Sequence, residues 1–160
     1  MTLHQLKRKQ ILPISLEQAW DFFSSPFNLA QITPPDMGFE VKLVQPEDKM
    51  YAGMIIAYRV SPLLHIPMGW VTEITHVQEP YYFVDEQRFG PYSLWHHQHH
   101  FKEVAEGVEM IDIVSYKIPF GLLGNIANAL FVRKRLEYIF DYRYQALEKK
   151  FAVKSVSSYQ

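Results

Sequence analysis

A cluster of histidines stands out in the segment GPYSLWHHQHHF, which spans residues 90–101. In an extended strand, successive side chains point to opposite faces, so His97 and His99 share one face with Trp95 and Phe101. Two large aromatic side chains favour burial of that face. The sequence therefore predicts two neighbouring imidazoles on an apolar surface, which is a setting for metal binding, acid–base chemistry or ligand recognition.

A carboxylate is predicted beside these imidazoles on the following strand. A tight turn at residues 106–107 would return the chain antiparallel and place His99 opposite Asp112, with Tyr116 opposite Trp95. Asp112 could then accept a hydrogen bond from His99 and fix its tautomer. This pair would also lower the free energy needed to bury both groups.

The preceding strand brings a second set of polar side chains toward the histidines. The motif DEQRF should place Asp85 or Glu86, together with Gln87, near His97. A shift of one residue in strand register reverses the face on which a side chain lies. The sequence leaves both carboxylates as candidates.

Three kinds of site fit this cluster. In a divalent-metal site, His97 and His99 would be ligands, with Asp112 or Asp85 as the third. In an enzyme of the cyclase, dehydratase or hydrolase type, His99 and Asp112 would be the catalytic pair, acting as a general base. In a binding pocket, the same groups would orient a small molecule between aromatic walls. A fourth alternative is a purely structural one, in which these residues form a satisfied polar network around a cavity that holds only water.

We prefer the binding pocket, without a metal or other cofactor, because the chain has no nucleophile elbow, phosphate loop or dinucleotide fingerprint. The expected ligand is a small hydrophobic or amphipathic molecule. The expected binding residues are aromatic walls and a few polar groups: Tyr58, Trp70, Trp95, Phe101 and Tyr116 as walls, and Gln87, His97, His99, Asp112 and Arg133 as polar groups.

The elements that must position these residues are predicted from periodicity. A first strand over residues 3–14 is followed by a capping box at Ser15 and Gln18 and by two short helices. Short runs rich in β-branched and aromatic residues then predict six strands in an antiparallel meander. These runs cover residues 39–44, 53–60, 68–77, 81–89, 92–104 and 108–118.

The chain is predicted to end in one long helix over residues 122–150. One face of this helix is apolar and should pack on the sheet. It comprises Leu122, Ile126, Ala129, Leu136, Phe140, Tyr144, Leu147 and Phe151. Arg133 lies near the centre of this face, where a guanidinium must be paired or reach a polar cavity. Arg143 lies at its margin, where it could bind a ligand carboxylate or form an ion pair that fixes the helix to the sheet, and we prefer the ion pair.

The order of these elements and four segments resemble the START-like helix-grip superfamily, also called SRPBCC. The segments are NLAQITPP, FVDEQRFGPYSLWHHQHHF, IPFGLLG and IFDYRYQAL. More narrowly, the chain is similar to bacterial ligand-binding SRPBCC proteins described as polyketide cyclase-like, over residues 3–151. The resemblance implies an α+β helix-grip fold, in which a curved antiparallel β-sheet wraps around the C-terminal helix. It also implies a cavity for a lipid-, polyketide- or aromatic-like ligand.

The charge and the cysteine content of the chain limit the partners and the chemistry that we expect. The chain has 16 Lys and Arg residues against 17 Asp and Glu residues, so its net charge of −1 gives no reason to expect nucleic acid. It contains no cysteine, which excludes disulfides, a cysteine nucleophile and thiolate metal sites.

No apolar segment is long enough to cross a bilayer or resembles a secretory signal, so we expect a cytoplasmic protein. We expect a single domain over residues 1–152 and a tail over residues 153–160. A second aromatic row on the last helix, formed by Phe131, Tyr138 and Tyr142, would suit a homodimer.

Overall fold

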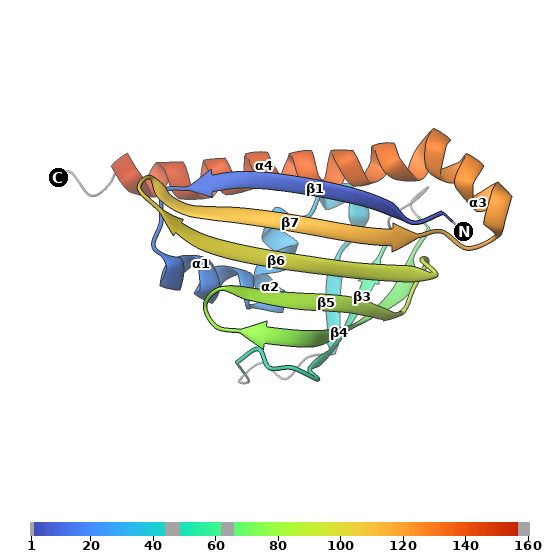
Figure 1. The fold of residues 1–160 in the computed structure, drawn as a ribbon, viewed down its shortest axis with the longest axis horizontal. Helices are drawn as coiled ribbons and strands as arrows, with labels where there is room; N and C mark the ends of the chain where they lie inside the picture. Colours follow the sequence, from blue (N-terminus) through green and yellow to red (C-terminus); the bar gives the residue numbers. More distant parts are fainter. Residues whose placement is uncertain (1, 44–48, 62–65, 157–160) are drawn as a thin grey trace.

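The computed structural model describes residues 2–43, 49–61 and 66–156 (Figure 1). In chain order, the elements are β1 (His4–Leu12), α1 (Leu16–Phe23), α2 (Pro26–Leu29), the 3-10 turns η1 (Ala30–Ile32) and η2 (Pro35–Met37), β2 (Glu40–Leu43), β3 (Ile55–Val60), β4 (Met68–Gln78), β5 (Tyr82–Phe89), β6 (Leu94–Val104), β7 (Gly107–Lys117), α3 (Gly121–Ala127), the π-helical segment η3 (Asn128–Val132) and α4 (Arg133–Val156).

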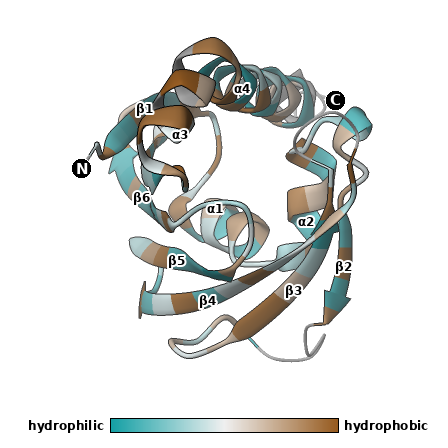
Figure 2. Ribbon diagram, turned by 90° about the vertical axis from the view of Figure 1, so that its right-hand side faces the viewer, coloured by the Kyte–Doolittle hydropathy of each residue, from teal (hydrophilic) through white to brown (hydrophobic). Residues whose placement is uncertain are grey.

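The described strands form one antiparallel sheet in the order β1-β7-β6-β5-β4-β3-β2. From β2 to β7 each strand pairs with the next, which confirms the predicted meander, and β1 joins at β7. The sheet curls, and α4 lies across the top of the curl (Figure 2). This is the predicted α+β helix-grip architecture.

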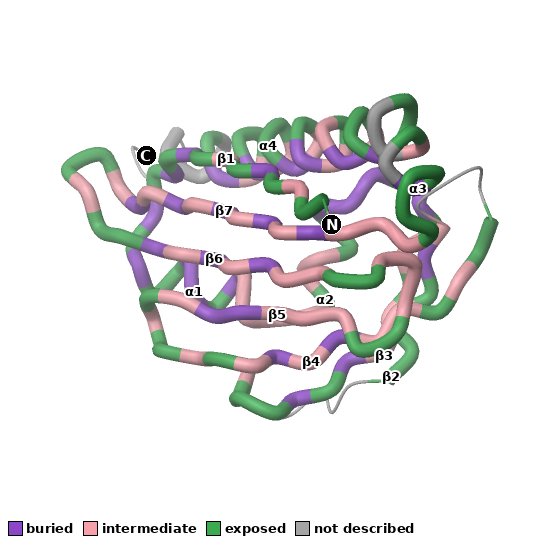
Figure 3. The backbone as a smooth tube through the Cα atoms, turned by 45° about the vertical axis from the view of Figure 1, so that its right-hand side comes forward, coloured by how far each residue is buried: buried purple, intermediate pink, exposed green. Residues whose placement is uncertain are grey.

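The register between β6 and β7 is the one that alternation and a tight turn predicted. Trp95 is opposite Tyr116, and His99 is opposite Asp112. The turn is made at Gly107, whose φ of +130° suits glycine. A Cβ there would lie 2.1 Å from the carbonyl oxygen of Leu12, so only glycine fits. Burial alternates along both strands (Figure 3), so one face of the sheet is the core face.

The first helices close one end of the curled sheet. The capping box is present, because Ser15 Oγ accepts from the backbone N–H of Gln18 and the Gln18 side chain accepts from the backbone N–H of Ser15. The apolar face of α1 packs on β6 and β7. There Trp20 meets Phe83 and Phe101 edge to face. This cluster forms the core at that end of the sheet.

The last helix differs from the prediction in its first turns. The π-helical segment η3 separates α3 from α4, and a wider turn changes the direction in which the preceding side chains point. Leu122 and Ile126 are therefore 77% and 50% exposed, so their assignment to the buried face is wrong. Tyr144 is also exposed. The buried face begins at Val132, the last residue of η3, and continues along α4 with Leu136, Phe140, Arg143, Leu147 and Phe151.

The end of α4 overlaps the predicted tail. The helix continues to Val156, and residues 157–160 lie outside the described residues. Among the described residues, no helix is long and apolar enough to cross a membrane. On the predicted aromatic row, Phe131 is exposed, while the exposed Tyr138 donates a hydrogen bond to Asp36 at 3.1 Å. The homodimer stays a prediction.

Candidate ligand cavity and its polar wall

A cavity of about 170 Å³ lies between the concave face of the sheet and α4. One water molecule needs about 10–15 Å³ by this kind of measure, so the cavity has room for an organic molecule. Most of its lining is apolar or aromatic. Its walls include Phe22, Phe23, Leu29, Ile32 and Met37 from the segment between β1 and β2, Tyr58, Trp70, Ile74, Tyr92 and Trp95 from the sheet side, and Leu136, Ile139 and Phe140 from α4.

The carboxylate and the two imidazoles of the lining lie on the central strands β5 and β6. Asp85 of β5 is directly opposite His97 of β6, which places its carboxylate on the cavity side. Asp85 Oδ2 lies 2.9 Å from His99 Nε2 and 3.3 Å from His97 Nδ1. The other oxygen, Oδ1, accepts a hydrogen bond from Trp95 Nε1 at 3.3 Å. Asp85 therefore joins the three side chains of β6 that face the cavity.

Asp112 lies behind the two histidines, on β7. Its Oδ1 accepts a hydrogen bond from His97 Nε2 at 3.1 Å and lies 2.9 Å from His99 Nδ1, which makes no hydrogen bond. Both imidazoles thus lie between the carboxylates of Asp85 and Asp112. The predicted pairing of His99 with Asp112 is present as a close contact, but the hydrogen bonds are crossed: Asp112 bonds to His97, and Asp85 bonds to His99. Long side chains reach diagonal neighbours across strands.

Arg143 brings a positive charge from α4 to this wall. It is buried and lines the cavity, and its Nη1 lies 3.8 Å from Asp112 Oδ1. This contact is the expected ion pair between helix and sheet. The guanidinium also lies over the Phe140 ring, and its buried Nε has no hydrogen-bond partner among the described residues. We call Asp85, His97, His99, Asp112 and Arg143 the polar wall.

The charges of the polar wall shift the pKa values of its members. Burial raises the pKa of each carboxyl group, but the neighbouring histidines lower it more, so the pKa of Asp85 is lowered and that of Asp112 lies well below its usual range. Burial lowers the pKa of His97, but the charge of Asp85 and the hydrogen bonds to both carboxylates outweigh it, so this pKa is raised. The folded state therefore favours ionised carboxylates and a protonated His97.

These shifts predict how stability depends on pH. A raised His97 pKa stabilises the fold fully below its ordinary value of 6.5, and this contribution is lost as the pH rises through the raised pKa. The lowered pKa values of the two carboxyl groups stabilise the fold fully above pH 3.8, their ordinary pKa, and this contribution is lost as the pH falls through the lowered values. We therefore expect the free energy of unfolding, measured in urea, to decrease as the pH rises from 6.5 through the raised pKa of His97.

The variant His97→Gln is the control for this pH dependence, because glutamine can donate a hydrogen bond but does not titrate. Besides Asp85 and Asp112, the rings of Trp95, His99 and Phe140 face His97. The decrease should be smaller in the variant. Stability that is constant or rising over this range in the wild type would contradict the assignment.

Five of the predicted binding residues line the cavity: Tyr58, Trp70, Trp95, His97 and His99. Burial raises the pKa of Tyr58, which keeps its hydroxyl protonated. Trp70 and Trp95 meet edge to face, with ring centroids 5.2 Å apart. The alternation of β6 and the aromatic composition of the strands were sufficient to find these residues.

The other predicted binding residues lie elsewhere. Phe101 and Tyr116 are buried in the core on either side of the cavity, and Asp112 contacts the histidines from behind. Gln87 bonds through its side chain to the backbone N–H and carbonyl of Tyr92, so it holds the turn between β5 and β6. It does not line the cavity.

Arg133 was placed wrongly. Its side chain is 70% exposed, and its Nε donates to Glu137 at 3.1 Å, one turn along α4. The predicted apolar face assumed one uninterrupted helix, whereas η3 ends immediately before Arg133 and changes the phase. The arginine that reaches the cavity is Arg143.

Sequence reasoning also missed part of the lining. Tyr92 lines the cavity beside Trp70 and Trp95, and burial raises its pKa. Its position directly after Gly90 and Pro91, before a strand with aromatic residues, was a usable signal. The residues between α1 and η2 gave no such signal, because their apolar side chains suit a core equally well.

Comparisons with known proteins show similarity in fold to solved structures. No protein-family model matches the sequence. No curated protein matches it either. Among solved structures, protein TTHA0849 from Thermus thermophilus is similar with a TM-score of 0.66 at 15% identity, over 95% of this chain and 99% of that chain.

Protein CV1439 from Chromobacterium violaceum is similar with a TM-score of 0.68 at 14% identity, over 92% of this chain and 96% of that chain. Major latex-like protein 151 from Panax ginseng has a TM-score of 0.67 at 11% identity, over 93% of this chain and 97% of that chain. At these identities the likeness concerns the fold. The chain has the helix-grip fold that its sequence segments predicted.

Proposed function

We propose that this protein binds a small hydrophobic or amphipathic molecule in the cavity between the sheet and α4. The observation that carries the proposal is the composition of the cavity: a mostly apolar and aromatic lining in which the carboxylate, the two imidazoles and the guanidinium lie together in the polar wall. Ligand pockets generally combine a hydrophobic surface with a few convergent polar groups. The ligand is therefore an apolar body with a polar end.

The polar end would be oriented by Arg143 and the histidines. The Nε of Arg143 is buried without a hydrogen-bond partner, and a buried donor is stabilised when it gains an acceptor. An oxygen of the ligand, such as a carboxylate, carbonyl or hydroxyl, can be that acceptor. The apolar body would lie against Trp70, Tyr58 and the helix residue Ile139.

Retained ligand can be detected by native mass spectrometry of untagged protein, followed by extraction with organic solvent. Binding can then be measured by quenching of tryptophan fluorescence, since Trp70 and Trp95 line the cavity. A set of aromatic, polyketide-like and acyl compounds, each with and without a terminal carboxylate, would identify the class. Saturable binding by none of them would count against the proposal.

The substitution Thr72→Phe should abolish or strongly weaken this binding. Thr72 is buried on β4 and lines the cavity, so a phenyl ring there occupies the ligand's space. Overpacking costs about 1–3 kcal/mol, which a stable fold can tolerate. The matched control is Thr75→Phe on the same strand, because Thr75 is outside the lining. Equal binding by both variants, with both folded, would show that the ligand lies elsewhere.

A further inference from the structure

The polar wall has the geometry of a metal-binding site. Asp85, His97 and His99 each offer one ligand atom, and these atoms all lie within 4.8 Å of one another. All three residues come from the paired strands β5 and β6. We propose that these three side chains bind one divalent first-row transition-metal ion, with a coordination position open toward the cavity.

The arrangement of hydrogen-bonding groups supports this proposal. All four ring nitrogens of His97 and His99 lie within 3.3 Å of a carboxylate oxygen of Asp85 or Asp112. Without a metal, protonation of a ring satisfies these contacts; a neutral imidazole has one N–H and one lone pair, so it would turn a lone pair toward a carboxylate oxygen unless a cation binds there. A cation beside Asp85 accepts both lone pairs. The far nitrogens, His97 Nε2 and His99 Nδ1, then carry their protons toward Asp112.

Asp112 lies beside the nitrogens of His97 and His99 that would not bind the metal, so it would hold the histidine ligands without binding the ion itself. Histidines that bind a metal through one nitrogen generally direct the other to a carboxylate or carbonyl, which fixes the ring. Here one oxygen, Asp112 Oδ1, lies 3.1 Å from His97 Nε2 and 2.9 Å from His99 Nδ1. Asp112 is 2% exposed, so water does not compete for this role. This buried carboxylate therefore orients His97 through a hydrogen bond and lies close enough to His99 Nδ1 to attract its proton.

The third ligand is also held in place. Trp95 Nε1 donates to Asp85 Oδ1, which leaves Oδ2 directed at His97 and His99. Ligands on neighbouring strands of a sheet are more rigid than ligands on loops, which favours a preorganised site. The cavity side of this group is open to the ligand space.

The donor set indicates the class of metal. Two imidazoles and one carboxylate suit zinc, iron, cobalt or nickel, whereas magnesium and calcium prefer sites made of oxygen ligands. Three protein ligands leave a position for a donor atom from a small molecule. The metal site and the ligand cavity share His97 and His99, but the two proposals can be tested separately, because the ion can bind when the cavity holds no organic molecule.

Titration with cobalt tests the metal site directly. Untagged protein is treated with chelator, dialysed and titrated with Co²⁺, which reports its coordination through visible absorption, and Zn²⁺ binding is measured by calorimetry. We expect one equivalent of metal to bind. Asp85→Asn and the double variant His97→Gln/His99→Gln should lose this binding. Asp112→Asn should weaken it by about 10- to 100-fold, the usual effect of changing a residue that holds the metal ligands.

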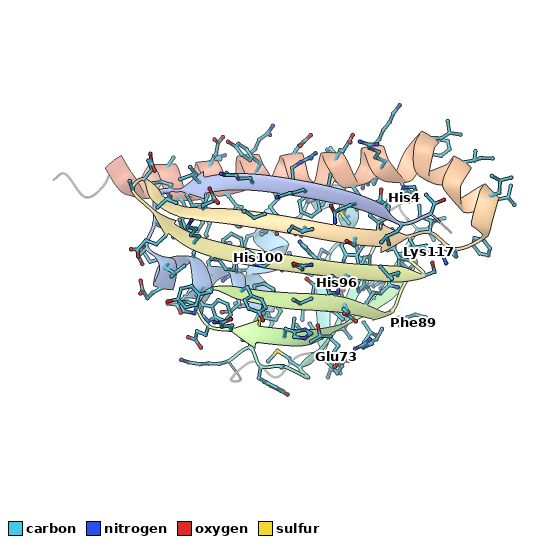
Figure 4. All side chains as sticks on the ribbon, in the orientation of Figure 1. His4, Glu73, Phe89, His96, His100 and Lys117 are labelled. Carbon is cyan, nitrogen blue, oxygen red and sulfur yellow. The ribbon has the colours of Figure 1, made fainter. Side chains whose placement is uncertain are left out.

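The control is the double variant His96→Gln/His100→Gln. These histidines lie on the same strand but on the outer face, where Figure 4 shows them. His96 contacts Glu86 there, and His100 contacts Gln98. We expect this variant to bind cobalt as the wild type does. Loss of binding in this variant, or its persistence in Asp85→Asn, would overturn the proposal.

Failure of the wild type to take up Co²⁺ or Zn²⁺ at stoichiometric concentration would also overturn it, and would favour two protonated imidazoles as the reason for the close contacts. If the double variant His97→Gln/His99→Gln does not fold, the paramagnetic shifts of histidine ring protons are measured in the cobalt-loaded wild type instead. Two shifted rings support the site, and none contradicts it. The Thr72→Phe test in chelator keeps ligand binding distinguishable from metal binding.

Discussion

Replacing Asp112 with alanine is expected to destabilise the protein by about 3–5 kcal/mol, because removing one partner of a buried ionic group leaves the others uncompensated. Asp112 is 2% exposed and faces His97, His99 and Arg143. Alanine would leave the His97 Nε2 proton without an acceptor and the Arg143 guanidinium without its nearby negative charge. Urea unfolding monitored by circular dichroism measures the loss.

Asp112→Asn separates the hydrogen bond from the charge. The amide oxygen can still accept from His97, so the loss of stability should be smaller than for alanine. If the protein only binds its ligand, ligand retention should fall in step with stability in both variants. If His97 or His99 is a general base, Asp112→Asn should bind almost normally but lose turnover, because an amide cannot stabilise an imidazolium ion.

The control for Asp112 is Asp141→Ala. Asp141 has a side chain that is 65% exposed and forms an ion pair with Arg8 at 3.5 Å. Exposed ion pairs contribute about 0–1 kcal/mol, so this variant should unfold close to the wild type. Equal losses for the two aspartates would mean that the polar wall is solvated, and the site described above would then be wrong.

Leu147→Ala should destabilise the protein by about 2–5 kcal/mol, the usual effect of truncating a buried leucine. Leu147 on α4 is fully buried in a cluster with Trp20, Phe22 and Phe151. It does not line the cavity, so ligand affinity of the folded protein should be unchanged. Chemical unfolding and fluorescence titration at low temperature measure the two properties separately.

Tyr144→Ala is the matched control for Leu147. The sequence assigned both residues to the buried face of the helix, but Tyr144 is 42% exposed. Truncation of an exposed side chain usually changes stability by no more than about 0.5 kcal/mol. A large loss for Tyr144 with a small loss for Leu147 would contradict the observed orientation of α4.

The fold could be predicted because each element carried its own signal. Alternation fixed the faces of β6 and β7, and the turn at Gly107 fixed their register, so His99 was correctly placed opposite Asp112. The partner strand β5 was harder, because the longer turn between Phe89 and Leu94 does not determine a register by length alone. The choice of Asp85 over Glu86 needed the three-dimensional structure.

The errors in the prediction of the last helix also come from a local change in backbone geometry. A helical wheel assumes a constant angle per residue, and a single π-helical segment breaks that assumption. After η3, Leu136, Phe140 and Leu147 were assigned to the correct face and Tyr144 was not, whereas before η3 both Leu122 and Ile126 were assigned wrongly. Arg133 is the first residue after η3, and the sequence predicted it, rather than Arg143, to reach the cavity. Local periodicity is reliable only as long as the helix geometry is continuous.

The pairing of β1 with β7 has a consequence for how the chain assembles. Leu12 pairs with Val108, and His4 pairs with Tyr116, so the first strand along the chain pairs with the last one. Contacts between distant segments slow folding, because the entropy of closing a long loop is lost before the contact forms. During synthesis, β1 leaves the ribosome first and cannot pair until β7 has followed. Because Asp112 lies on β7, we expect the polar wall to form only in these late steps.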